Sequence, residues 1–400
     1  MTINAVETTA GGRPVLLLRP DVSQPARCGI DLVAAAAHAR ETGGAIYLLL
    51  DGESIPVSVD GVPVITPHGV HRVWLSAVWR TASAARDVRA WWRHVEASVT
   101  REWRRELRRH IGDERLPFEL RQRLRSTAEA SIRRVRTETN AFPRRMLRAP
   151  SAVSLSPDFV EEARSQLTAL GITDGRPLVT FESRTRPDIA AAVMDFLVSE
   201  GYAVARIGPS TEGVRCCDGV VDLTTRAPRP LSLEMFLVSA SAFIMCESTD
   251  VQQLAYLVNT PSLTINARDP FVAYPVRTNG LFALSAAIDL ESAQPITIGD
   301  MLTQPYFRDL HKQQVRGRRR GSHGYRDNTV EELTEAIKEM RAGIADGWAS
   351  ESETQSRFRQ RVVEAGAALA PISAHVAEWG PDDGFIGDGR LVRFQADRVS

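Results

Sequence analysis

Residues 177 to 266 alternate between short apolar runs and segments with helical spacing, and this alternation constrains the fold more than any other feature. The apolar runs are PLVTFES, YAVARIG, GVVDLT, AFIMCES and SLTIN, with helical patterns such as DIAAAVMDFLVSEG and LSLEMFLVSAS between them. These runs lack the strict polar alternation of a half-exposed strand, as expected when helices cover both faces of a sheet. This pattern therefore predicts a doubly wound parallel sheet in the second half of the chain.

The first half also begins as an α/β pattern. Val15 to Leu18 form a short apolar run, residues 29 to 44 have helical spacing and end in glycines, and residues 45 to 50 form a second apolar run. Strand, helix and strand within about 35 residues are typical of a βαβ unit. The sequence therefore predicts two α/β domains, at residues 1–150 and 151–345, separated by a Pro- and Ser-rich linker at 148–159.

Residues 80 to about 140 change to a helical pattern. Their tryptophans and aliphatic residues recur at three- and four-residue spacing on two successive segments, which predicts a helical hairpin in the first domain. Residues 80 to 148 contain 19 Arg against 9 Asp plus Glu. This excess has two interpretations, a nucleic-acid surface or the solvated outer face of two helices. We favour the second, because the tryptophans lie at core spacing and do not interleave with the arginines.

Composition excludes several classes of protein. The chain has 400 residues, no formal net charge, and no run that approaches 18 apolar residues, and its first residues lack the pattern of a signal peptide. Four cysteines without metal-ligand spacing indicate a reduced environment. We therefore expect a cytoplasmic protein without a transmembrane segment.

The last part of the chain begins with a helix that has a recognisable start. Thr329 is followed three residues later by Glu332, the spacing of a capping box, and an apolar stripe follows over residues 330 to 340. For residues 346–400 the sequence predicts one more helix, followed by an irregular tail that is rich in Gly, Asp and Arg.

Polar side chains follow three of the predicted strands. In an open parallel sheet, ligands bind beyond the carboxyl ends of the strands, so these side chains form the candidate site. The third group also opens a helix, whose free N–H groups favour an anion. Arginines and a helix amino terminus together indicate a diphosphate site. The candidate residues are Glu182, Arg184, Arg186, Arg206, Gly208, Glu247, Ser248, Thr249 and Asp250.

Each of these residues also has a purely structural interpretation. Ser248 and Thr249 could simply cap the following helix, and Arg206 could form a buried salt bridge. The convergence of three strand ends favours the functional interpretation. His68 and His71 lie three residues apart without further ligands near them in the sequence, so we expect no metal site.

Residues 177 to 343 resemble the C-terminal half of a bacterial family of GT-B glycosyltransferases related in shape to heptosyltransferases. The pieces that carry the resemblance are RTRPDI, GYAVARIG, LVSASAFIMCEST, NTPSLTIN and DNTVEELTEAIKEM, about 40% of the chain. In that family a Ser-Ser-Gly turn contacts the donor's phosphates, and Ser248 and Thr249 match its first two positions. Arg206 matches an arginine of the family, whereas Asp250 stands where the family usually has Gly.

The resemblance implies two Rossmann-like domains, with the donor site in the second domain and the acceptor site in the first. An inverting enzyme of this fold needs a base in the cleft between the domains, and dipoles and cations that stabilise the leaving diphosphate without a metal. The turn after the first strand offers Asp31 as the first candidate base and Asp21 as the second, with Glu182 third. Asp31 also has a structural interpretation, as a charge that complements a helix amino terminus.

The leading hypothesis is therefore a metal-independent glycosyltransferase that moves a sugar from a nucleotide-sugar donor to a small-molecule or glycan acceptor. The donor is a substrate, and we expect no cofactor and no nucleic-acid partner. Two alternatives stay open, a nucleotide-sugar epimerase or hydrolase of the same fold, and a catalytically silent protein that binds nucleotide sugars.

Overall fold

The structure is a computed structural model, and it describes the second half of the chain more fully than the first. The described residues are 5–10, 13–18, 35, 39, 43–48, 57–59, 64–65, 153–172, 175–182, 184–208, 214, 216–224, 231–247, 249–271, 273–303, 305–306, 322–348, 351–369 and 388–397. The predicted helical hairpin at about 80–140 and the candidate bases Asp21 and Asp31 lie outside these residues.

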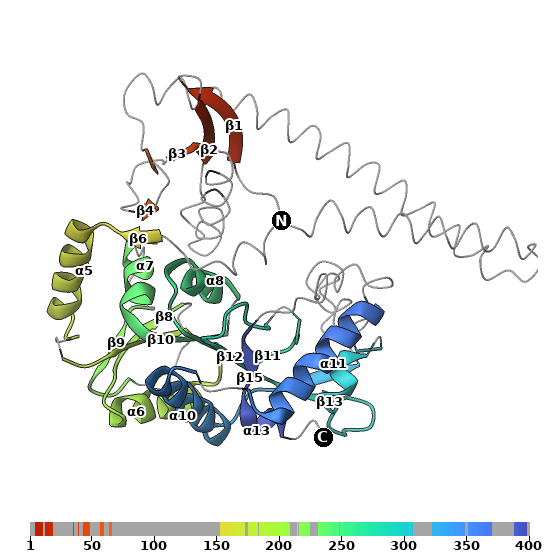
Figure 1. The fold of residues 1–400 in the computed structure, drawn as a ribbon. Coiled ribbons are helices and arrows are strands. Elements are labelled where there is room, and N and C mark those ends of the chain that lie inside the picture. Colours follow the sequence, from red (N-terminus) through yellow and green to blue (C-terminus); the bar gives the residue numbers. More distant parts are fainter. Residues whose placement is uncertain are drawn as a thin grey trace, which may run out of the picture.

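A parallel sheet of seven strands forms the centre of the second half, as the sequence predicts (Figure 1). The strand order is β15-β12-β11-β10-β7-β8-β9. Their bounds are β7 Leu178–Glu182, β8 Ala203–Ile207, β9 Val220–Asp222, β10 Ser241–Cys246, β11 Ser262–Ala267, β12 Gly280–Leu284 and β15 Arg390–Leu391.

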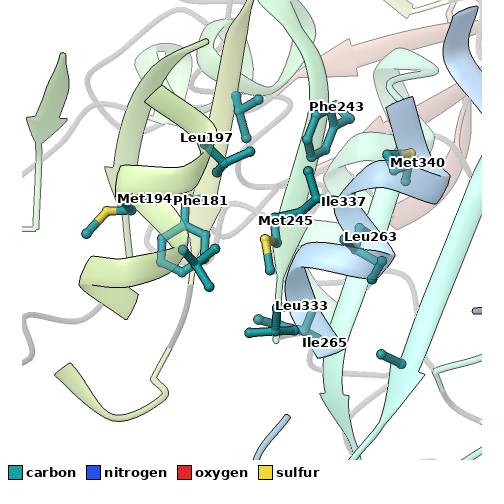
Figure 2. Packing of buried hydrophobic residues seen from close by; sticks show 14 of the residues in the cluster. Phe181, Met194, Leu197, Phe243, Met245, Leu263, Ile265, Leu333, Ile337 and Met340 are labelled. Atoms are coloured by element: carbon teal, nitrogen blue, oxygen red, sulfur yellow. The ribbon is translucent and has the colours of Figure 1, made fainter. Parts of the chain in front are cut away.

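Helices α6 (Pro187–Ser199) and α10 (Val330–Asp346) cover one face of this sheet and contact each other. Figure 2 shows how their apolar side chains pack on those of β7, β10 and β11, for example Leu197 and Ile337 against Phe243. Burial of such a continuous apolar layer is the main favourable contribution to the stability of the fold.

In the described part of the chain, the opposite face of the sheet is covered by four helices, α5, α7, α8 and, near the C-terminus, α11. α5 (Pro157–Ala169) and α7 (Leu231–Ala240) pack over β7 and β8, and α8 (Thr249–Val258) packs beside α7. α11 (Glu353–Leu369) completes this layer near β15, where Phe358 lies in a cluster with Tyr274 and Phe282. The sheet is thus covered on both faces, which explains why its strands read as unbroken apolar runs.

The described part of the first half contains a separate four-stranded sheet of order β1-β2-β3-β5. The bounds are β1 Ala5–Ala10, β2 Arg13–Leu18, β3 Ala45–Leu48 and β5 Val64–Ile65. β2 and β3 are parallel, and Ala35 and Ala39 between them are helical and buried, as the predicted βαβ unit requires. β1 pairs antiparallel with β2, so this sheet is mixed, and a second Rossmann-like domain stays a prediction.

The predicted linker differs from the structure. Part of it forms β6 (Val153–Leu155), which pairs antiparallel with β4 (Val57–Val59), and α5 begins directly afterwards at Pro157. Proline is favoured at the first helical position because its missing N–H needs no partner there. Pro and Ser in this stretch therefore mark the start of a helix as well as a chain connection.

The C-terminal region combines a confirmed prediction with a corrected one. Thr329 and Glu332 form the predicted capping box of α10, with both reciprocal hydrogen bonds present. The tail is not irregular throughout, because Arg390–Leu391 form β15 of the main sheet and α13 (Arg393–Ala396) follows. A two-stranded antiparallel sheet of β13 (Ala286–Asp289) and β14 (His323–Arg326), with the short helix η1 (Asp300–Leu302) between the two strands in the sequence, precedes α10.

Among the described residues, no helix combines the length and the apolar character needed to cross a membrane.

Candidate functional site

The seven-stranded sheet has a topological switch point between β7 and β10. The chain runs from β7 outward through β8 and β9, then returns to the other side of β7 as β10 and continues through β11 and β12. The connections on the two sides of β7 therefore diverge at its carboxyl end, where open α/β sheets bind ligands. Glu182 ends β7, and Glu247 directly follows β10.

Glu182 joins three strand ends at this point. It is paired in register with Cys246 of β10 and Ile207 of β8, and its side chain is buried. The backbone N–H of Glu247 donates to Glu182 Oε2 at 3.1 Å and to its backbone oxygen at 3.2 Å. This carboxylate therefore holds β10 against β7 where the strands end.

Gly208, which follows β8, packs directly on Glu182. Its φ is +99°, and a Cβ at this position would lie 2.9 Å from Glu182 Cγ. Both the left-handed backbone and the close approach require glycine here. Gly208 was a predicted site residue, and the structure brings it together with Glu182.

A chain of amide side chains extends the site from Glu247 to the start of α10. Asn266 Nδ2 donates to Glu247 Oε1 at 2.9 Å. The side-chain oxygens of Asn266 and Asn328 each accept from the other residue's backbone N–H, at 2.7 and 2.9 Å. Asn266 has a φ of 52°, in the left-handed region that asparagine tolerates better than most residues. These contacts fix the orientation of the half-buried Glu247 carboxylate.

Two predicted arginines follow β7 at this edge. Arg184 and Arg186 are both exposed. Arg186 forms an ion pair with Asp188, with Nη2 at 2.6 Å from Oδ2 and Nε at 3.1 Å from Oδ1. Arg184 therefore offers its guanidinium to a ligand more readily than Arg186 does.

Thr249 and Asp250 are the first two residues of α8, so the helix starts close to the switch point as predicted. The structure describes their backbone and not their side chains, and Ser248 lies outside the described residues. The first backbone N–H groups of an α-helix have no partner within the helix, so the start of this ten-residue helix is a candidate anion site.

Arg206 lies in a different environment from the one that a phosphate ligand needs. Its side chain is 3% exposed, and Nη1 lies 2.8 Å from Asp222 Oδ2 on the neighbouring strand β9. Val204 and Val220, two residues earlier on each strand, pack in the α6–α10 core, so the pair faces α6. Arg206 Nε has no hydrogen-bond partner among the described residues. The structural interpretation of Arg206 as a buried salt bridge therefore has direct support.

Hydrogen bonds and charge hold Asp222 in its ionised form. Burial alone would raise the pKa of this carboxyl group, but hydrogen bonds from the Thr224 hydroxyl and backbone N–H, together with the charge of Arg206, lower it below its usual value. A depressed pKa at this position stabilises the ion pair at neutral pH.

Three residues of this edge escaped the sequence analysis. Asn266 ends the run SLTIN, so the strand-end rule that found Glu182 could also have found it. Asn328 precedes the capping box by one residue, and Asp222 lies within GVVDLT and ends β9. Asn328 belongs to a loop rather than to a strand end, so only the folded chain shows that it reaches Asn266.

Within the described part of the chain, no group of three or more His, Cys, Asp or Glu residues could hold a metal ion.

Comparison with known proteins adds one slight likeness. No family model matches the sequence, and no curated protein matches it significantly. A glycosyl transferase family 9 structure from Veillonella parvula aligns with a TM-score of 0.29 and 10% identity. The alignment covers 49% of this chain and 55% of that one, so the matched region spans about half the length of that protein. At this TM-score the likeness is too slight to bear on fold or function.

Proposed function

We propose that the chain is a glycosyltransferase of the GT-B type, and that the diphosphate of a nucleotide-sugar donor binds at the carboxyl edge of the seven-stranded sheet. One observation carries this proposal, the switch point at which β7 and β10 end side by side and α8 begins. The ordered sequence pieces that resemble a glycosyltransferase family lie around the same edge, from RTRPDI after β7 to NTPSLTIN at β11.

In this proposal the phosphates lie against the backbone N–H groups at the start of α8, with Ser248 and Thr249 in the turn and Arg184 as the charged partner. Arg206 anchors β9 to β8 and stabilises the carboxyl edge of the sheet from the side that α6 covers. Glu247, oriented by Asn266, lies beside the phosphates and accepts hydrogen bonds from donor hydroxyl groups. The leaving diphosphate is stabilised by dipoles and arginine, so the reaction runs without a metal ion.

The acceptor side of the proposal rests on the sequence. Residues 1–150 hold the acceptor, and Asp31 is the first choice for the base that takes the acceptor's proton, with Asp21 the second. Glu182, the third choice, is buried and accepts a hydrogen bond from Glu247 N–H, so we assign it a structural role in place of the role of base.

The proposal predicts that nucleoside diphosphates bind to the protein and that Arg184 contributes to their affinity. Calorimetric titration with UDP, GDP, ADP and CDP should show saturable binding of at least one of them. Arg184→Gln should weaken that binding about tenfold or more, the scale of a lost charge-assisted hydrogen bond. Arg164→Gln is the matched control, because Arg164 is an exposed arginine on α5 away from the switch point, and it should leave the affinity unchanged.

Two outcomes would count against this assignment. Absence of saturable binding for every diphosphate would remove the donor site itself. Equal affinities of wild type and Arg184→Gln would place the phosphates elsewhere in the molecule.

A second candidate is hydrolysis or epimerisation of the nucleotide sugar. It is favoured by Glu247, a half-buried carboxylate on the donor side that could act as a general acid or base without an acceptor domain. Product analysis in EDTA, with and without an acceptor, separates the candidates. Transfer needs an acceptor, whereas hydrolysis and epimerisation do not. A silent nucleotide-sugar-binding protein would bind the donor and turn over in neither assay.

A further inference from the structure

A pocket of about 520 Å³ lies between α10 and α13, close to the amino ends of two strands. Leu281, the second residue of β12, and Arg390, the first residue of β15, both line it. The candidate donor site lies at the carboxyl ends of β7 and β10 in the same parallel sheet, so this pocket belongs to the opposite edge of the sheet. Its volume lies within the range of small-molecule sites.

The pocket has an aromatic wall built by an unusual backbone. Trp348 directly follows the C-cap of α10, and its N–H donates to Gly343 O at 2.8 Å. The indole ring lies so close to Gly343 that a Cβ there would be 2.6 Å from two ring carbons. Trp348 itself has a φ of 60°, a conformation that costs energy for a bulky side chain. Phe394 of α13 also lines the pocket, so the walls include two aromatic rings.

The charged groups around these rings have a small excess of negative charge. Lys338 is paired with Glu335 at 2.7 Å, and Glu339 accepts from the backbone N–H of Arg393 at 2.7 Å. Burial raises the pKa of Glu339 above its usual value, and the hydrogen bonds from Arg393 N–H and Gln355 and the charges of Arg393 and Arg390 oppose this rise. The lining has four carboxylates, Glu335, Glu339, Asp346 and Asp397, and three cationic side chains, Lys338, Arg390 and Arg393.

The carboxyl end of α10 adds to this negative potential. Its last turn contains no basic residue, and Asp346 is its final residue. A helix carboxyl terminus carries a partial negative charge that a nearby cation complements. The face of an indole ring also attracts cations. Asp346, the helix end and Trp348 therefore all favour the same kind of ligand.

We propose that this pocket binds an organic cation with an apolar body, of the class of arylalkylammonium ions. The ammonium group lies near Asp346 and the end of α10, and the apolar part packs against Trp348, Phe394 and Ala342. This site is separate from the proposed donor site and does not depend on the glycosyltransferase assignment.

The test compares three probes of similar shape by ligand-observed NMR, phenethylammonium, neutral 2-phenylethanol and anionic phenylacetate. Phenethylammonium should bind saturably, with a dissociation constant of about 1 mM as expected for so small a molecule, and more tightly than the other two. Asp346→Asn should weaken its binding about threefold to fivefold, and added salt should weaken it further. Lys338→Gln, which removes a positive charge from the lining, should strengthen binding about twofold.

Asp158→Asn is the matched control, because Asp158 is an exposed aspartate in the first turn of α5, and this change should leave the affinity unaltered. Trp348→Leu should also weaken binding, with far-UV circular dichroism used to verify that the variant is folded. The proposal is overturned if phenylacetate binds as tightly as phenethylammonium, if no probe saturates, or if folded Asp346→Asn binds phenethylammonium like the wild type.

Discussion

At the scale of single residues, the Arg206–Asp222 pair shows how a residue at a strand end can serve the sheet itself. Desolvation of two charges costs more than their attraction returns unless hydrogen bonds satisfy their remaining atoms. Asp222 meets this condition, because its Oδ1 accepts from both the hydroxyl and the backbone N–H of Thr224. The pair thereby anchors the short edge strand β9 to β8.

We predict that Asp222→Asn destabilises the protein by about 2–3 kcal/mol, because it leaves the buried Arg206 guanidinium without a countercharge. The shift of the urea unfolding midpoint at neutral pH measures this change. Asp188→Asn makes the same substitution in the Arg186–Asp188 pair, whose side chains are 70% and 60% exposed. This control should shift the midpoint far less, and equal shifts for both variants would contradict the role given to the buried pair.

The stability difference between wild type and Asp222→Asn should also depend on pH. The pKa of Asp222 is lower in the folded protein than its usual value of 3.8, so the folded state favours the ionised carboxyl group. Its contribution is therefore complete above about pH 4 and is lost as the pH falls through the folded pKa. Unfolding at pH 7 and at acid pH tests this sign, because the two proteins should converge in acid.

At the scale of elements, α10 is the helix whose start the sequence defines most sharply. Thr329 accepts from Glu332 N at 3.2 Å, and the backbone N–H of Thr329 donates to Glu332 Oε2 at 3.0 Å. The same helix carries Leu333, Ile337 and Met340 into the main core. Its amino terminus also follows Asn328, which is bonded to Asn266 at the carboxyl edge. The capping box therefore supports both the core and the candidate site.

We predict that Thr329→Ala lowers the free energy of unfolding by about 1 kcal/mol, the usual cost of losing a helix cap. Thr334→Ala on the same helix is a control for the loss of a threonine hydroxyl away from the helix end. Urea denaturation of both variants measures the difference. An unchanged midpoint for Thr329→Ala would show that packing alone fixes the start of α10.

The sequence predicted the elements whose signals are local. The capping box and the apolar runs of β7, β8, β10 and β11 can be recognised within a few residues, and the structure contains each of them. β15 has two residues and exists because it pairs with β12, more than 100 residues earlier, so no local pattern marks it. The strand-end rule likewise located Arg206, but it could not show that the Arg206 guanidinium would form an ion pair with Asp222.

At the scale of the whole molecule, the two edges of the seven-stranded sheet have different chemistry. The carboxyl edge combines Glu182, Glu247 and Asn266 with the start of α8, and the amino edge holds the aromatic pocket beside α10. A nucleotide sugar and an organic cation would therefore bind at separate places. Residues 1–150 are assigned to the acceptor. Of this part of the chain, the structure describes mainly the four-stranded sheet.

Hydrogen–deuterium exchange with and without a saturating nucleoside diphosphate tests the central claim most directly, because it reports where the ligand binds. We predict slower exchange in peptides that cover residues 182–189 and 246–254, on both sides of the switch point, as the start of α8 donates its N–H groups to phosphate. Peptides from the end of α10, around Trp348, should exchange at an unchanged rate. Protection confined to the end of α10, or to any region other than the carboxyl edge, would contradict the proposed donor site.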